Sequence, residues 1–110
     1  MIRYDKLVRD KIPQLIAEKG ERPLVRVLDE EEYAECLERK LDEETAEYHL
    51  DKNPEELADI LEVVFALAEQ QGCSLEELME LYQQKHDARG GFAERIFLIG
   101  KEYAPGFPGA

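Results

Sequence analysis

A turn between two helical stretches is the feature that most constrains how this chain can fold. Asn53 and Pro54, followed by Glu56, are typical of a helix start: Asn caps the first turn, Pro fits the first helical position, and the acid completes a capping box. Before the turn, apolar or aromatic residues recur at steps of three and four, as on one face of a helix: Tyr33, Leu37, Leu41 and Tyr48. The sequence therefore predicts an antiparallel helix hairpin, folded about a midpoint between Asp51 and Lys52.

Folding the hairpin about this midpoint brings acidic side chains level with one another. Glu47 then lies opposite Glu56, and Glu44 lies opposite Asp59. Acids three residues apart in one helix are separated by about 4.5 Å along its axis, and packed helices lie about 8–10 Å apart. Four carboxylates can therefore converge on a space that suits one or two hard cations.

Glu44 is the acid that makes a cation most necessary. It lies in the middle of the apolar stripe, between Leu41 and Tyr48, so it faces the partner helix. Two unscreened carboxylates about 6 Å apart repel by roughly 3 kcal/mol at an effective dielectric constant of about 20. A divalent cation with oxygen ligands offsets this repulsion, and Mg²⁺, with Mn²⁺ as the alternative, is the expected ion.

Three blocks of sequence carry a resemblance to a known family. The acids follow the spacing K-x-x-E-E-x-x-E over residues 40–47 and E-x-x-D over residues 56–59. This spacing resembles the all-α nucleotide pyrophosphohydrolases, the MazG-like and phosphoribosyl-ATP pyrophosphohydrolase-like superfamily. The opening YDKLVRDKIP and the later RGGFAERI look like a compact single-domain branch of it, so the resemblance covers nearly the whole chain to about Gly100. Only eight residues separate Glu47 from Glu56, a shorter connection than in many MazG-type members.

The resemblance implies a metal-dependent enzyme that cleaves the α–β phosphoanhydride of a nucleoside triphosphate to a monophosphate and pyrophosphate, in the house-cleaning of non-standard nucleotides. The metal ligands expected from the hairpin geometry are Glu44, Glu47, Glu56 and Asp59. Glu43, on a different azimuth of the same helix, is the candidate general base or else a group behind the ligands. Phosphate contacts are expected from a pool of basic residues: Lys6, Arg9, Lys40, Lys85, Arg89 and Arg95.

Several of these residues also have a purely structural interpretation. Lys6 and Arg9 can form a solvated face that counters the protein's own negative field, and Lys40 can be an ordinary i,i+4 partner of Glu44. Glu56 can act only as the capping-box acid of its helix. Cations at a helix C-terminus complement its dipole, which accounts for the end of the last predicted helix: Lys85, His86 and Arg89. No role is assigned to Glu62, His49 or His86.

We expect a mainly α fold, with four helices in a MazG-like arrangement around the antiparallel hairpin and a small two-stranded β element. The helices are predicted over residues 10–20, 29–50, 54–71 and 74–89, with Asp10, Asp29, Asn53 and Ser74 as caps. The short apolar runs PLVRVL (23–28) and RIFLIG (95–100) are predicted to be paired strands. One domain is expected over residues 1–102, followed by a Pro/Gly-rich tail over 103–110.

The third predicted helix implies an oligomer. Its interior, ADILEVVFALA, is apolar on nearly every side, and four short helices scarcely cover such a helix. We therefore expect a second subunit to pack on it, as a homodimer or a larger assembly.

Composition excludes several classes of partner. A formal net charge of −12, a pI of about 4.6 and no Trp argue against binding to nucleic acid or to an anionic membrane surface. No apolar run approaches the roughly 20 residues of a membrane span. The opening residues turn charged at once, so no signal peptide is predicted and a cytoplasmic protein is expected.

Two rival functions remain. Phosphoribosyl-ATP pyrophosphohydrolysis, a step of histidine biosynthesis, uses the same chemistry, and the base and sugar recognised cannot be derived from these residues. The other rival is a non-catalytic acidic helical module that dimerises or binds a basic partner. It predicts that Glu44→Gln stabilises the protein without loss of function, whereas a metal site predicts that Mg²⁺ or Mn²⁺ raises the melting temperature.

Overall fold

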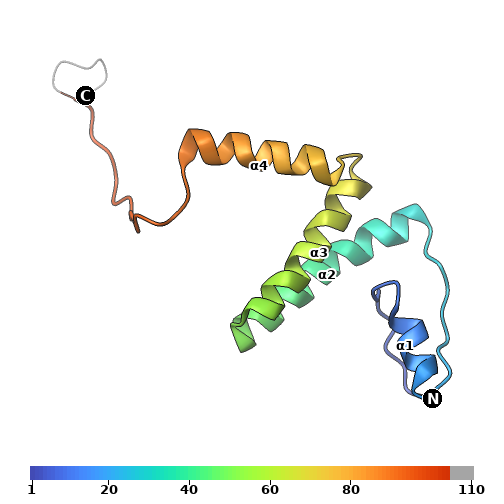
Figure 1. Cartoon of the computed structure of the whole chain (residues 1–110). Coiled ribbons are helices and arrows are strands. Elements are labelled where there is room, and N and C mark those ends of the chain that lie inside the picture. Colours follow the sequence, from blue (N-terminus) through green and yellow to red (C-terminus); the bar gives the residue numbers. More distant parts are fainter. Residues whose placement is uncertain (105–110) are drawn as a thin grey trace. The chain divides into compact units, whose positions relative to one another are not determined.

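The structure, a computed structural model, describes residues 1–104 of the 110-residue chain. Four helices form in this range (Figure 1): α1 (Ile12–Glu18), α2 (Glu30–Asp51), α3 (Pro54–Gln70) and α4 (Leu75–Arg89). The predicted mainly helical fold is confirmed. The chain divides into a first unit, Met1–Leu78, and a second unit that begins at Met79, within α4. Each unit is described by itself.

The hairpin of α2 and α3 organises the first unit. Only Lys52 and Asn53 separate the two helices, and α3 runs back beside α2 (Figure 1). Lys52 adopts the left-handed conformation, with φ +49°, and its N–H donates to the carbonyl oxygen of Tyr48 at 2.7 Å. Asn53 Oδ1 then accepts from the backbone N–H of Glu56 at 3.0 Å. These two local contacts reverse the chain, as the capping pattern predicted.

The core of this hairpin is small. Its buried apolar residues are Leu37 on α2 and Val63 and Ala68 on α3, and the acid Glu44 is buried with them. Leu57 and Leu61, also on α3, are about half exposed, at 47% and 51%. The second subunit expected to cover α3 stays a prediction.

Two further predicted caps are confirmed and one is wrong. Asp29 Oδ1 accepts from the backbone N–H of Glu32 at 2.9 Å, and Ser74 Oγ accepts from that of Glu77 at 3.1 Å. Asp10 does not cap α1, which begins at Ile12 with Lys11 as its cap residue and no side-chain cap. Residues 10 and 11 instead form a turn, in which the backbone N–H of Ile12 donates to the carbonyl oxygen of Arg9 at 3.0 Å.

The predicted β element is wrong for the residues that the structure describes. Neither 23–28 nor 95–100 is a strand, and most of their residues are exposed, with Val27 and Ile99 each at 96%. Arg26 instead makes a two-bond ion pair with Glu32 of α2, at 2.7 and 3.1 Å. Arg95 adopts a left-handed φ of +60°, which breaks the extended run at its first residue. A strand needs a partner for its backbone groups, and an alternating pattern does not supply one.

The predicted Pro/Gly-rich tail covers residues 103–110, of which 105–110 lie outside the described residues. Among the helices that are described, none combines the length and the apolar character needed to cross a membrane.

Candidate metal centre

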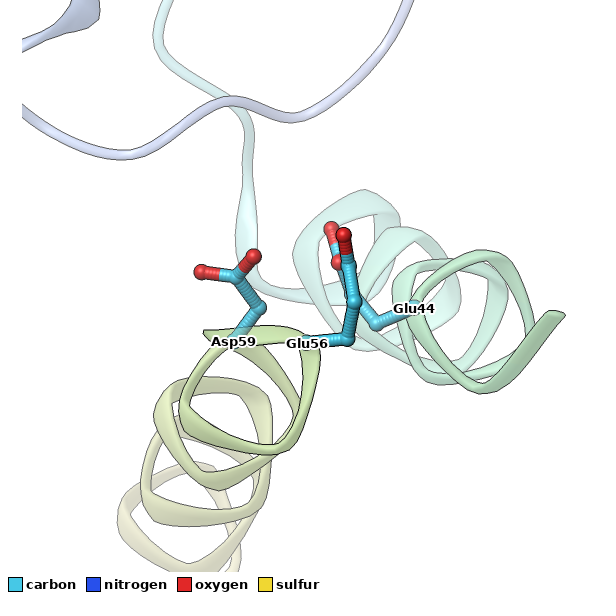
Figure 2. A group of neighbouring side chains, drawn as sticks. All are labelled: Glu44, Glu56 and Asp59. Carbon is cyan, nitrogen blue, oxygen red and sulfur yellow. The ribbon is translucent and has the colours of Figure 1, made fainter. Parts of the chain in front are cut away.

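Three carboxylates converge where α2 and α3 face each other. Glu44 comes from α2, and Glu56 and Asp59 come from the first turns of α3. One oxygen of each lies within 4.8 Å of the others, and the three side chains point to the same space (Figure 2). The two arms of the hairpin therefore meet in an acidic cluster, as the level pairing of acids predicted.

The cluster leaves two buried acceptor atoms without a partner among the described residues. Glu44 is only 9% exposed, and its Oε2 and the Oε2 of Glu56 have no hydrogen-bond donor. A buried polar atom left unsatisfied costs about 1–3 kcal/mol, and more when it is charged. Such atoms therefore call for a proton or a cation.

The pKa values of the two glutamates are displaced in the same direction. Burial is the main cause that raises the pKa of Glu44, and the charges of Glu47 and Asp59 add to it, while Lys40 opposes the shift. The pKa of Glu56 is also raised, first by desolvation and then by neighbouring carboxylates, of which Glu47 acts most strongly. Desolvation is thus the largest cause of both shifts, and the neighbouring carboxylates act in the same direction.

The donor set fits a hard divalent cation. Three carboxylates from two helices offer oxygen ligands and no thiol or imidazole, and oxygen donors suit Mg²⁺ and Mn²⁺. Two of those oxygens have no other partner, so a cation would take the place of missing donors rather than displace existing ones. The third residue, Asp59, already has a partner, Arg9.

Glu47, the fourth predicted ligand, has a different position. Its side chain is exposed, and it is not one of the three carboxylates that converge within 4.8 Å. Its charge nevertheless raises the pKa of both Glu44 and Glu56. Glu47 thus belongs to the electrostatic environment of the cluster, and its role as a ligand stays a prediction.

Lys40 is the basic residue most deeply placed beside the cluster. Its Nζ lies 3.6 Å from Glu44 Oε1 and 3.4 Å from Glu43 Oε2, and its side chain is only 15% exposed. The predicted i,i+4 pairing with Glu44 is therefore present. The same ammonium group also holds Glu43, the candidate base, which lies outside the three converging carboxylates.

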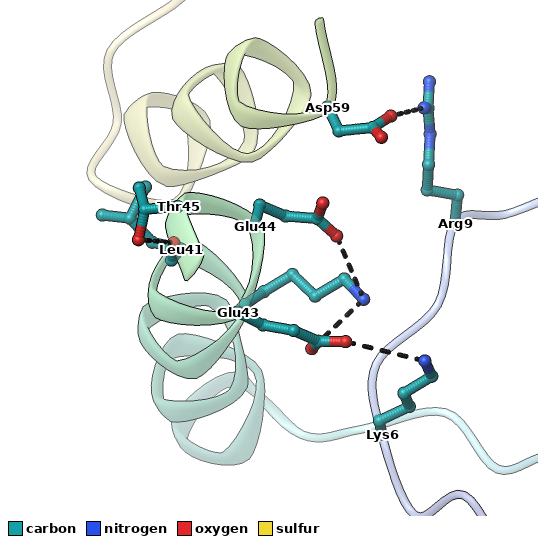
Figure 3. Close-up of polar contacts among 8 residues, drawn as sticks. Lys6, Arg9, Leu41, Glu43, Glu44, Thr45 and Asp59 are labelled. Atoms are coloured by element: carbon teal, nitrogen blue, oxygen red, sulfur yellow. Dashed lines mark hydrogen bonds and ion pairs between the residues drawn. The ribbon is translucent and has the colours of Figure 1, made fainter. Parts of the chain in front are cut away.

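The opening segment supplies two more cations. Lys6 Nζ lies 3.6 Å from Glu43 Oε1, and Arg9 Nη1 lies 3.2 Å from Asp59 Oδ1 (Figure 3). Arg9 also reaches Glu62, with Nη2 3.8 Å from Oε2. No role was predicted for Glu62. The sequence does indicate that Glu62 lies near Asp59, because a spacing of three residues places both acids on one side of α3.

The remaining basic residues of the predicted pool lie in the second unit. Lys85 and Arg89 are exposed on α4, and Arg95 is exposed in the segment that follows it. Their phosphate contacts stay predictions.

Comparison with known proteins adds one partial match. A stretch of 42 residues is 52% identical to an uncharacterized protein of Mycolicibacterium smegmatis (strain ATCC 700084 / mc(2)155). The match covers 38% of this chain and 43% of that protein, so it spans less than half of the relative's length. No protein-family model and no solved structure matches the chain.

Proposed function

We propose that this chain is a MazG-like, Mg²⁺- or Mn²⁺-dependent nucleoside triphosphate pyrophosphohydrolase. It hydrolyses the α–β phosphoanhydride, releases a nucleoside monophosphate and pyrophosphate, and acts on non-standard nucleotides. The observation that supports this most is the pair of buried, unpartnered carboxylate oxygens of Glu44 and Glu56 beside Asp59. The bond that is cleaved follows from the resemblance of the acidic spacing.

The charge balance of this region favours the addition of a cation. Seven acids (Glu43, Glu44, Glu47, Asp51, Glu56, Asp59 and Glu62) face three cations, Lys6, Arg9 and Lys40. The formal balance is therefore four negative charges in excess. Glu44, Glu56 and Asp59, with Glu47 as the fourth predicted ligand, would hold this cation, which would supply charge neutralisation at the phosphates and a more acidic water.

The chain's own residues divide the remaining work. Glu43 is the proposed general base, which accepts a proton from the attacking water. Lys40 fixes the carboxylates of Glu43 and Glu44 relative to each other, because its ammonium lies within 3.6 Å of both. Lys6 and Arg9 place positive charge at the side of the cluster reached by the opening segment, where phosphate oxygens can be bound. The phosphate contacts predicted for Lys85, Arg89 and Arg95, which belong to the second unit, stay predictions.

A release assay tests the proposal. Purified protein is incubated with Mg²⁺ and a panel of standard and modified nucleoside triphosphates, and pyrophosphate and phosphate are measured separately. Pyrophosphate with a nucleoside monophosphate identifies α–β cleavage, whereas phosphate alone identifies β–γ cleavage. Phosphoribosyl-ATP is included, since preferred hydrolysis of this compound would assign the histidine-biosynthesis activity instead.

Two variants connect activity to the cluster. Glu44→Gln and Asp59→Asn each remove one ligand charge and should lower the rate by at least about tenfold, the smaller loss typical of groups that only support a metal ligand. Glu38→Gln, on the exposed face of α2, makes the same change of charge away from the cluster and is the matched control. Equal rates in all three variants and the parent would end the metal-site assignment.

A non-catalytic interaction module is the second candidate, favoured by the half-exposed leucines of α3. In that case Glu44→Gln raises stability with no loss of partner binding, and the release assay stays negative with every nucleotide.

A further inference from the structure

We propose that Arg9 is an internal counterion of the cluster, which a divalent cation displaces from Asp59 and thereby releases for phosphate. The inference rests on the proposed function, because it concerns the same cation site and the same anionic substrate. It assigns Arg9 two successive partners: a carboxylate in the cation-free protein and a phosphate group in the loaded one.

The contacts of the opening segment support an exchangeable partner. Arg9 Nη1 lies 3.2 Å from Asp59 Oδ1, and Lys6 Nζ lies 3.6 Å from Glu43 Oε1. The segment thus touches both arms of the hairpin through charged side chains (Figure 3). Residues 1–9 form no helix or strand. The ion pairs between this segment and the hairpin can therefore change without unfolding a helix.

Exposure separates Arg9 from Lys40. The side chains of Arg9 and Asp59 are 61% and 41% exposed, so water and salt screen this ion pair. Lys40 and Glu44 are only 15% and 12% exposed, and they lie one turn apart on the same helix. A cation that binds the cluster is therefore expected to leave Lys40 in place and to displace Arg9.

Charge gives the direction of the exchange. Asp59 is one of the three carboxylates that converge, so a cation bound there lies close to the Arg9 guanidinium. Two like charges at such a distance repel each other, and the guanidinium is the one that can move away. The released guanidinium has the flat, forked donors that match a phosphate group. Cation binding would then precede and favour binding of the triphosphate.

The test is a calorimetric titration of the full chain with Mn²⁺ alone, without nucleotide. Removing the competing charge in Arg9→Gln should tighten Mn²⁺ binding by roughly two- to fivefold, the range expected for an exposed ion pair. The matched control is Arg3→Gln, which removes the same charge from the same segment at a residue that pairs with Asp5 instead. Its Mn²⁺ affinity should change less than that of Arg9→Gln. Circular dichroism spectra confirm that each variant keeps the helical fold.

The outcomes distinguish this inference from the proposed function. If Asp59→Asn abolishes Mn²⁺ binding but Arg9→Gln leaves it unchanged or weakens it, the cation site stands and the exchange is wrong. Weakening would mean that Arg9 holds Asp59 in place for the cation. If Asp59→Asn binds Mn²⁺ like the parent, the cluster is not the site, and both proposals are overturned. As a second readout, Mn²⁺ should speed backbone hydrogen exchange in residues 3–11 of the parent. Slower or unchanged exchange there would contradict the release of Arg9.

Discussion

Lys40 and Glu44 form the most buried ion pair among residues 1–104, with Nζ and Oε1 3.6 Å apart and side-chain exposures of 15% and 12%. This pair joins the core of the hairpin to the acidic cluster, because Glu44 is both a core residue and a candidate ligand. Lys40 is the neighbour that opposes the rise in the pKa of Glu44. Among the neighbours that shift the pKa of Glu44, Lys40 is the one that supplies positive charge.

Replacing Lys40 should therefore destabilise the fold. In Lys40→Met the stem of the side chain is kept and the charge is lost, so the free energy of unfolding should fall by about 1–3 kcal/mol, the cost of an unpaired buried polar group. Chemical denaturation in the absence of divalent cations measures the change. Arg39→Met, at the exposed neighbouring position of α2, is the control and should change stability by less than about 0.5 kcal/mol. Equal losses in both variants would contradict the structural role of the pair.

The pH dependence of stability should follow from the raised pKa of Glu44. Its pKa in the folded protein lies above the ordinary value of 4.5, so the folded state binds the proton more tightly than the unfolded state does. The destabilisation caused by this carboxylate is therefore fully present above the folded pKa and disappears as the pH falls toward 4.5. Glu56 shifts in the same direction and adds to the effect.

Comparison with Glu44→Gln isolates this contribution. The pKa values of Asp5 and Glu32 are lowered by Arg3 and Arg26, and these exposed groups favour the opposite trend in both proteins alike. The difference in unfolding free energy, Glu44→Gln minus parent, should be positive at neutral pH and should shrink on acidification. Added Mg²⁺ should remove the difference at neutral pH by stabilising only the parent. A difference that is independent of both pH and Mg²⁺ would contradict the prediction.

The Asn53 cap at the hairpin turn should contribute to stability apart from the effects of the acidic cluster. Asn53→Ala removes the acceptor of the Glu56 N–H, so the free energy of unfolding should fall by about 1 kcal/mol. Asn53→Asp keeps an acceptor at the same place and should retain most of the stability. Thermal melts of the three proteins check both expectations, and a loss in Asn53→Asp equal to that in Asn53→Ala would show that the cap is not the cause.

Local patterns predicted most of what positions the cluster. Caps at Asp29, Asn53 and Ser74 act within three residues, so the sequence places the starts of α2, α3 and α4 correctly. Helical periodicity then brings Glu44 toward Asp59, because the turn between the helices is short.

Contacts between distant residues could not be predicted in this way. Arg9 and Asp59 are 50 positions apart, and no spacing rule connects an irregular segment to a helix face. The same limitation explains the failed β element, since alternation in 23–28 shows only that a strand could form there and says nothing about a partner. The start of α1 differs for another reason: residues 10 and 11 form a turn closed by the Ile12 N–H and the Arg9 carbonyl oxygen, so Asp10 makes no cap contact.

The apolar face of α3 gives a prediction about assembly. Leu57 and Leu61 are one turn apart and 47% and 51% exposed, and they lie on the same helix as two residues of the cluster. If a second copy covers this face, Leu61→Lys should place a charge in the interface and shift the protein toward the monomer in sedimentation velocity. Leu50→Lys, at an 83% exposed position in the last turn of α2, is the control and should leave the assembly unchanged. A parent protein that sediments as a monomer at every concentration would show that α3 is not covered by a second copy.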